Sequence, residues 1–476
     1  MTQATTSPDT RPDLAHRLFF VLWSIAMLFQ LVAVLWLPMN LLSSPPTLIG
    51  IVELALMGAC LVVLLKPDSA QAILSLSALN VLDMALTLPH APNHRMLSAF
   101  INLMLLCSGL VLSIRERKLD AAKLFALFAP CGRVSTLILY FFVTFHKINT
   151  DFLDPEVSCT AQFYQHILRT LPMLPAQTWV YYTIPWATLL VEAAIPILLF
   201  FRRTRSAGVI LGVVFHSFLA IDVEKHFFDF SSTMLALLSL GVDRSGFQRI
   251  WQLAESTPVG ALTRLRTLFI CWYVTAFLFA LFHGSDFMFS VFFAGRQILW
   301  WTFDAFAISV CIRGLVPRIG GSELEHPFCI RSPLLVALAG LVLLNGLTPY
   351  LGLKTRSSFD MYANLRVHDG ETNHLLIPRT LDLFGYLEAP VRIITTSDPA
   401  LMADYVKEDY LMPYFEFRNY LSTHQDISIE YARAGQTFTL KRAGDSPEFQ
   451  APPSMLARKL LWFRPIDAHA KNRCQW

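Results

Sequence analysis

The feature that most constrains this chain is a series of apolar stretches long enough to cross a lipid bilayer. A spanning helix needs about 20 mostly apolar residues, and Leu18–Leu37 contains no charged residue. Ten further candidates follow before residue 349, so we predict an all-α polytopic membrane bundle of about eleven spans. The ten are Leu48–Leu65, Ala70–Leu88, Met96–Ile114, Val134–His146, Trp179–Phe201, Ala207–Ile221, Phe227–Gly241, Thr267–Phe282, Val291–Ile312 and Pro333–Thr348.

The composition agrees with a membrane protein and excludes other classes. Charged residues make up 15% of the chain and hydrophobic residues 54%, whereas an ordinary soluble domain is about 25% charged. A soluble enzyme of this size is therefore excluded. Disorder is excluded as well, because it needs low hydrophobicity and high charge. The net charge of +3 indicates no broad basic surface, so nucleic acid is not an expected partner.

The positions of Lys and Arg predict the orientation in the membrane. With eleven spans and a cytoplasmic N-terminus, the inside segments hold 18 of these residues and the outside loops hold 4. That imbalance is what the positive-inside rule requires. We therefore predict a multi-pass protein of the inner or plasma membrane, with everything after Thr348 outside the cytoplasm. The short segment Lys118–Phe128 has basic flanks and is predicted to lie at the membrane surface.

The chain changes character at Lys354, which divides it into a membrane domain, 1–353, and an extracytoplasmic mixed α/β domain, 354–476. Charged residues and tyrosines become more frequent, and no long apolar run remains. Ile429 and Tyr431 alternate with polar residues before a turn, which predicts a β-hairpin. Pro399–Leu421 is predicted to form a helix that Asp398 caps.

The cysteines and histidines do not predict a metal site. Of the eight cysteines, only Cys159 and Cys474 should face an oxidising compartment, and the sequence leaves open whether they form a bridge. His90 and His94 have the spacing that binds metal on a helix. However, Pro92 lies between them and no third ligand is evident.

A lysine at the edge of an apolar stretch is the first candidate for chemistry. Lys147 directly follows His146, and Asn149 and Asp151 come next. Loss of water beside hydrocarbon disfavours an ammonium and makes a lysine a more usable base. The alternative is a structural lysine that extends its amine to the membrane surface.

A second group of candidates lies in the later spans. His216 is at the middle of a predicted span and must find a polar partner inside the bundle. Glu192, in the preceding span, is the candidate partner. Lys225 and His226 follow at the outer surface. The alternatives are a hydrogen-bonded pair that fixes helix register and a solvated turn.

These positions together predict a pocket that opens towards the outer leaflet. By the predicted topology, His94, Lys147, Lys225 and His226 lie at the outer face and His216 lies deeper. Abundant phenylalanines nearby could stack on a ring, so an amphiphilic or quinone-like ligand from the bilayer would suit such a pocket. Aromatic residues that merely face lipid are the alternative.

Motifs in a fixed order resemble a known family. His146-Lys147-Ile148-Asn149-Thr150-Asp151-Phe152 resembles a segment of the vitamin K-dependent γ-glutamyl carboxylase superfamily, whose bacterial members are called HTTM (horizontally transferred transmembrane domain) proteins. Asn93-His94 resembles the Asn-His of that family. Further similar segments are Val191–Pro196, Phe215–Ser217, Met361–Arg366 and Asn373–Leu375.

The resemblance implies a reaction. In the eukaryotic carboxylase, reduced vitamin K is deprotonated by a lysine and reacts with oxygen. The resulting strong base removes a γ-proton from a protein-bound glutamate, and the carbanion captures carbon dioxide. Lys147 would be the base, with His94 as its partner and His216 in support. The pocket implied by the resemblance and the placement above contains Asn93, His146, Asn149, Asp151, Glu192, Lys225 and His226.

The same resemblance implies a reduced quinone of the vitamin K or menaquinone type as cofactor and a protein substrate on the outer side. It also implies that His94 and Lys147 line one cavity. The outer domain is much smaller than that of the animal enzyme, which leaves little room for its propeptide-binding surface. Two alternatives remain: a non-catalytic lipid- or quinone-binding module or interaction scaffold, and a transporter, although no internal repeat is visible.

Overall fold

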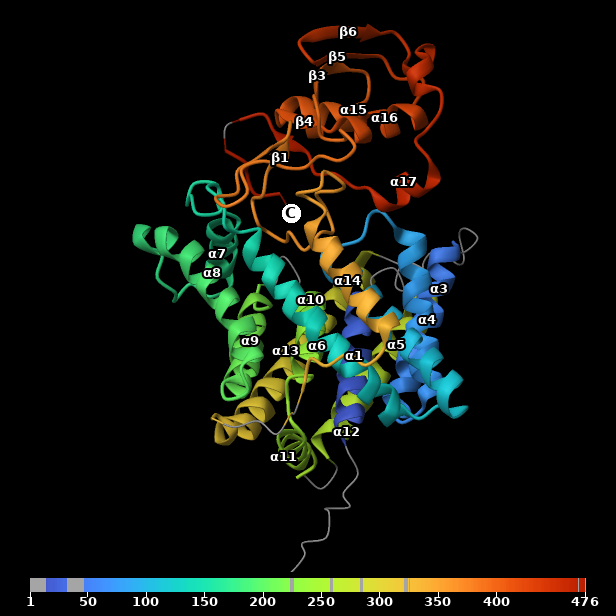
Figure 1. The fold of residues 1–476 in the computed structure, drawn as a ribbon, viewed down its shortest axis with the longest axis vertical. Helices are drawn as coiled ribbons and strands as arrows, with labels where there is room; N and C mark the ends of the chain where they lie inside the picture. Colours follow the sequence, from blue (N-terminus) through green and yellow to red (C-terminus); the bar gives the residue numbers. More distant parts are fainter. Residues whose placement is uncertain are drawn as a thin grey trace, which may run out of the picture.

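The computed structural model describes residues 14–31, 47–222, 227–256, 260–282, 286–320, 324, 326–469 and 471–475. Figure 1 shows a bundle of helices with a smaller part on one end that contains the strands. The bundle is formed from the first three quarters of the chain. The strand-containing part is formed from residues that follow the last long apolar helix.

Each predicted span contains a helix in the structure. Among the described residues, seven helices are long and apolar enough to cross a membrane by themselves, which confirms a multi-pass membrane protein; the count of eleven stays a prediction. The last six residues of the first predicted span, 32–37, lie outside the described residues. The helices are α1 (Ala15–Gln30), α3 (Leu48–Leu65), α4 (Ala70–Thr87), α5 (Asn93–Glu116), α6 (Ala121–Phe145), α8 (Thr178–Phe200), α9 (Arg205–Leu219), α10 (Phe228–Ser239), α12 (Ala261–Phe282), α13 (Asp286–Leu315) and α14 (Pro333–Leu347).

Two amphipathic helices, α7 (Cys159–Thr170) and α11 (Arg244–Glu255), and the short η2 (Val316–Arg318) connect these spans. Helix α1 is buried over most of its length and packs against α3, α6 and α10. Helix α6 packs against α5, α8 and α14, while α9 packs against α8, α10 and α13. Helices α6, α8, α9 and α10 therefore meet in one region of the bundle.

The predicted surface helix Lys118–Phe128 was wrong. Most of it belongs to α6, which starts after Asp120 and continues through Pro130 into the predicted fifth span. The Asp120 carboxylate caps this helix by accepting from Lys123 N at 2.9 Å. Arg133, which directly precedes the predicted fifth span, lies within α6 and donates from Nε to the carbonyl of Leu240 at 2.6 Å. A proline inside a membrane helix is tolerated where neighbouring groups satisfy the freed backbone.

The part that follows α14 is built on antiparallel strands. Strands β1 (Val367–His368) and β2 (Glu371–Thr372) pair with each other, and five others form a sheet in the order β6-β5-β3-β4-β7. The five are β3 (Val391–Thr396), β4 (Tyr410–Met412), β5 (Ile429–Arg433), β6 (Gln436–Leu440) and β7 (Ile466–Asp467). Helices α15 (Pro399–Leu401), η3 (Met402–Lys407), α16 (Tyr414–Thr423), η4 (Ala443–Asp445), η5 (Pro447–Phe449) and α17 (Met455–Leu460) complete it.

The predicted hairpin is confirmed, and the predicted helix Pro399–Leu421 is wrong in part. Strands β5 and β6 pair across Ala434 and Gly435, which both have positive φ, as a tight hairpin turn requires. Asp398 does cap a helix start, accepting from Ala400 N at 2.8 Å. The helix then gives way to β4, which fills the place between β3 and β7. Sheet pairing therefore overrides the local helical pattern.

A disulfide joins two distant parts of the chain. Cys159, at the start of α7, is bonded to Cys474, 315 residues away. A cross-link stabilises a fold mainly by restricting the unfolded chain, by about 2–5 kcal/mol in typical cases. We expect Cys474→Ser to lower the melting temperature and to expose the C-terminal segment to limited proteolysis.

Cys329→Ser is the matched control for that disulfide experiment, since Cys329 is a free, exposed cysteine. Equal melting temperatures and equal proteolytic patterns for Cys474→Ser and the wild type would contradict a stabilising bridge.

A buried carboxyl in α16 makes stability depend on pH. Glu416 accepts a hydrogen bond from Phe463 N at 2.8 Å, and burial raises its pKa from 4.5 to about 7. The folded state therefore keeps this proton up to about pH 7, while the unfolded state loses it near pH 4.5. Its stabilisation is complete below pH 4.5 and is lost as the pH rises through 7.

We expect Glu416→Gln to remove this pH dependence, which melting temperatures measured between pH 5 and pH 8 would show. Glu448→Gln, at an exposed position, should behave like the wild type. A Glu416→Gln protein whose melting temperature falls as steeply with pH as that of the wild type would refute this role.

Candidate functional site

Lys147 and Glu192 form a buried ion pair in the bundle. Lys147 is the second residue after the end of α6, and its Nζ lies 2.8 Å from Glu192 Oε1 and 2.7 Å from Oε2 on α8. The two residues are only 4% and 5% exposed. The amine also lies 5.8 Å from the centre of the Phe152 ring. The lysine therefore does not extend to solvent, as the structural alternative required, but is held inside the protein.

His216 and Tyr140 form a second buried polar pair beside the first. The Tyr140 hydroxyl on α6 lies 2.8 Å from His216 Nε2 on α9. His216 is 1% exposed, and within the described part of the chain its Nδ1 has no hydrogen-bond partner. The expectation that Glu192 pairs with His216 is therefore wrong, because Lys147 occupies both carboxylate oxygens.

Both pairs line one cavity, which we call the apolar cavity. Its free volume is about 100 Å³. Apart from Lys147, Glu192, Tyr140 and His216, most of its lining is apolar or aromatic, and helix α7 contributes Cys159, one end of the disulfide. Such an arrangement places a few polar groups against an otherwise hydrophobic surface, which is the usual character of a small-molecule site.

His94 lies in a different cavity from Lys147, so the expectation of one shared cavity is wrong. His94 and Asn93 line a neighbouring, more polar cavity of about 320 Å³ together with Asp229, whose Oδ2 lies 3.2 Å from His94 Nε2. We call it the polar cavity. The two cavities share a partition, because bulky side chains fill the space between them. Its members are Phe227, Phe230, Met361 and Tyr362.

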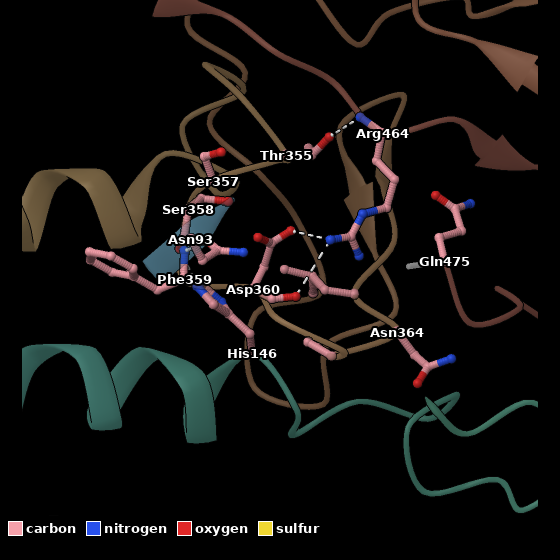
Figure 2. Close-up of polar contacts among 12 residues, drawn as sticks. Asn93, His146, Thr355, Ser357, Ser358, Phe359, Asp360, Asn364, Arg464 and Gln475 are labelled. Atoms are coloured by element: carbon pink, nitrogen blue, oxygen red, sulfur yellow. Dashed lines mark hydrogen bonds and ion pairs between the residues drawn. The ribbon is translucent and has the colours of Figure 1, made fainter. Parts of the chain in front are cut away.

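The other residues of the lysine motif hold the chain together rather than line either cavity. His146 Nδ1 lies 2.9 Å from the Tyr350 hydroxyl and Nε2 lies 3.2 Å from the Ser358 carbonyl. Figure 2 shows His146 close beneath the segment that contains Ser358 and Asp360.

Asn149 and Asp151 bind the turn after α6 to the later domain. Asn149 Nδ2 donates to the carbonyls of His146 and Ala363 at 2.7 and 2.6 Å. Asp151 Oδ2 accepts from Asn373 Nδ2 at 2.9 Å and from Asn472 N at 2.8 Å. Neither side chain is among the residues that line the two cavities, because backbone and amide groups hold both of them.

The remaining predicted candidates have separate outcomes. Asn93 borders the polar cavity, as predicted for a pocket residue, and its Oδ1 accepts from Phe359 N at 2.6 Å (Figure 2). Lys225 and His226 lie outside the described residues. Among those that are described, no group of three or more His, Cys, Asp or Glu side chains is placed to hold a metal.

Sequence reasoning missed Tyr140 as a member of the site. Helical spacing in the sequence indicates it, since Tyr140, Val143 and Lys147 follow the 3.6-residue period of one helix face. All three line the apolar cavity. Tyr362 and Arg356 reach the site from beyond α14, and no local pattern connects them to it. Their position depends on how the later domain packs on the bundle.

Comparison with known protein families places the predicted histidine, lysine and glutamate candidates within one matched region. The sequence of residues 92–243 matches the HTTM domain, and this range contains His94, Lys147, Glu192 and His216. No curated protein and no solved structure matches the chain. The chain therefore contains a region, residues 92–243, that is similar to the HTTM domain of membrane proteins.

Proposed function

We propose that this protein is an integral membrane enzyme that carries out hydroquinone- and oxygen-dependent, carboxylation-type chemistry at the outer leaflet, with Lys147 as the base. The observation that carries the proposal is the buried contact of Lys147 with Glu192 on the wall of the apolar cavity. Intramembrane ionisable groups are costly and are usually functional. The similarity of residues 92–243 to the HTTM domain agrees with this assignment.

The side chains that line the apolar cavity have the chemical character that a quinone needs. The cavity itself is small. Aromatic side chains such as Phe215 and Phe230 border it, and His216 has a ring nitrogen without a partner in the described structure. A free volume of about 100 Å³ is below the usual range of roughly 300–1,000 Å³. Entry of a quinone ring therefore requires side chains such as Met361, a flexible residue type, to move aside.

Lys147 and Glu192 can move a proton as a unit. In the resting ion pair the proton is on Nζ, so one proton must first pass to a Glu192 oxygen, 2.7 Å away. The N–H bond breaks and an O–H bond forms. The amine lone pair then accepts the proton of a ligand hydroxyl, whose O–H bond breaks to leave an oxyanion beside the Lys147 ammonium. A reduced quinone held here would supply, together with oxygen, the strong base that this class of reaction needs.

His94 is proposed to serve the second reactant. Its imidazole contacts Asp229, and a carboxylate in this position fixes the orientation and protonation of a histidine ring. His94 borders the polar cavity, across the partition from Lys147. The proposal therefore assigns the quinone to the apolar cavity and the molecule to be modified to the polar one. A protein substrate would have to present its reacting group there.

The site is proposed to face an oxidising compartment. The disulfide between Cys159 and Cys474 supports this placement, because stable disulfides are characteristic of extracytoplasmic environments. The excess of Lys and Arg on the predicted cytoplasmic loops supports the same orientation. Residues 354–476 would then form an extracytoplasmic domain on an inner or plasma membrane.

A second candidate function is a non-catalytic lipid- or quinone-binding module. The observation that favours it is a groove of about 390 Å³ between α6 and α8, lined by side chains such as Phe141, Phe145, Pro196 and Phe200. An acyl or isoprenoid chain would fit such an apolar surface. This candidate predicts ligand binding without turnover.

The test is to incubate the purified protein in lipid nanodiscs with reduced menaquinone or vitamin K and oxygen. Quinone epoxide formed above a protein-free control would support the enzyme. Quinone retained by the protein, with no epoxide formed, would support the binding module. Absence of both epoxide and bound quinone would contradict both candidates.

A further inference from the structure

The polar cavity is bordered by an arginine that has an unsatisfied hydrogen-bond donor. Arg356 lines this cavity and stacks on Trp462, with its Cζ 4.9 Å from the ring centre. Within the described residues, its guanidinium forms no ion pair, and its Nε is buried without a hydrogen-bond partner. Burial is the main cause that lowers the pKa of Arg356. The side chain is partly exposed, but its buried Nε–H is a donor without an acceptor, which an anion would supply.

The other charges around the cavity are already paired. Arg464 contacts Asp360 with Nη2 2.9 Å from Oδ2, as Figure 2 shows, and Asp229 contacts His94 at 3.2 Å. Two carboxylates are thus matched by one arginine and one histidine. Asp360 and Glu416 lie near enough to Arg356 to interact with it electrostatically, but within the described residues neither forms an ion pair with it, so its N–H donors are left to hold an anion.

We propose that the polar cavity binds an oxyanion, the carboxylate or phosphate group of a ligand, with Arg356 as its main contact. Arginine holds such groups through two parallel N–H donors, a geometry that lysine cannot reproduce. A volume of about 320 Å³ admits a small organic anion. The stacked Trp462 ring holds the guanidinium plane in place. Binding of an oxyanion here does not depend on quinone chemistry in the apolar cavity.

Calorimetric titration tests this site with defined probes. The protein in phosphatidylcholine nanodiscs would be titrated with inorganic phosphate and with glutarate, and protein in nanodiscs that contain phosphatidylglycerol would be examined for retained lipid by native mass spectrometry. Binding of a soluble probe identifies a free anion as the source. Selective retention of phosphatidylglycerol without binding of either soluble probe identifies a lipid headgroup.

For whichever probe binds the wild type, we expect Arg356→Gln to raise the dissociation constant about tenfold or more, because charged hydrogen bonds are lost. Arg356→Lys should restore part of it, which separates loss of charge from misfolding. Arg442→Gln is the matched control, because Arg442 is an exposed arginine paired with Asp426.

Two results would overturn the proposal: a wild-type protein that binds neither the soluble anions nor phosphatidylglycerol, or a folded Arg356→Gln protein that binds as tightly as the wild type. Loss of epoxide formation in Lys147 variants bears on the quinone chemistry alone. The two proposals can therefore fail separately.

Discussion

Replacing Lys147 by alanine is expected to slow quinone epoxide formation by about 10²–10⁴-fold, the usual contribution of a positioned general base. The reason is geometric: the amine is held on the cavity wall by Glu192, at 2.7 and 2.8 Å from its two oxygens. Within the described residues, no other basic side chain forms an ion pair with this carboxylate. Initial rates of epoxide formation, measured at saturating reduced quinone, would give the effect.

Lys147→Arg separates the chemical role from the structural one. Arginine keeps a positive charge beside Glu192, so the fold should survive, but it does not lose its proton in proteins. We therefore expect a folded and inactive enzyme. Lys123→Ala should keep full activity, since Lys123 forms an exposed pair with Glu116 at the other end of α6. Epoxide formation at the wild-type rate by Lys147→Ala would remove the lysine from the mechanism.

Replacing Glu192 by alanine is expected to destabilise the protein by about 3–5 kcal/mol, because it leaves the Lys147 ammonium buried and unpaired. Both partners are almost inaccessible to solvent, so water cannot replace the lost carboxylate. Thermal unfolding in detergent, monitored through the loss of helical signal, would measure this change in stability. Glu116→Ala, which removes an exposed pair, should cost at most about 1 kcal/mol.

The double variant Lys147→Met with Glu192→Leu gives the decisive comparison for the ion pair. Replacing a buried ion pair by apolar residues of similar size is often neutral or stabilising. We therefore expect this variant to melt close to the wild type and to lack epoxide formation. A pair retained for chemistry predicts that outcome, whereas a pair needed for folding predicts a protein that is even less stable than Glu192→Ala.

Much of the helical architecture could be predicted from the sequence, because it depends on local patterns. Apolar runs of sufficient length marked the spans, and alternation around Ala434 and Gly435 marked the hairpin. Local reasoning failed where distant groups decide the outcome. Lys118–Phe128 was predicted as a separate surface helix, yet most of it is continuous with the following span in α6. The segment before Tyr410 is helical in pattern, yet Tyr410–Met412 joins a sheet.

The candidate site also has features that local sequence patterns predict and features that only distant contacts decide. The sequence by itself determined that this is a membrane protein and that Lys147, Glu192 and His216 lie in or beside apolar spans. Only the tertiary structure decided that Lys147 pairs with Glu192, that His216 pairs with Tyr140, and that His94 borders a separate cavity. Helix periodicity is a property of neighbouring residues. Partner choice depends instead on how helices rotate and cross, which contacts between residues 45 and 76 positions apart in the chain make clear.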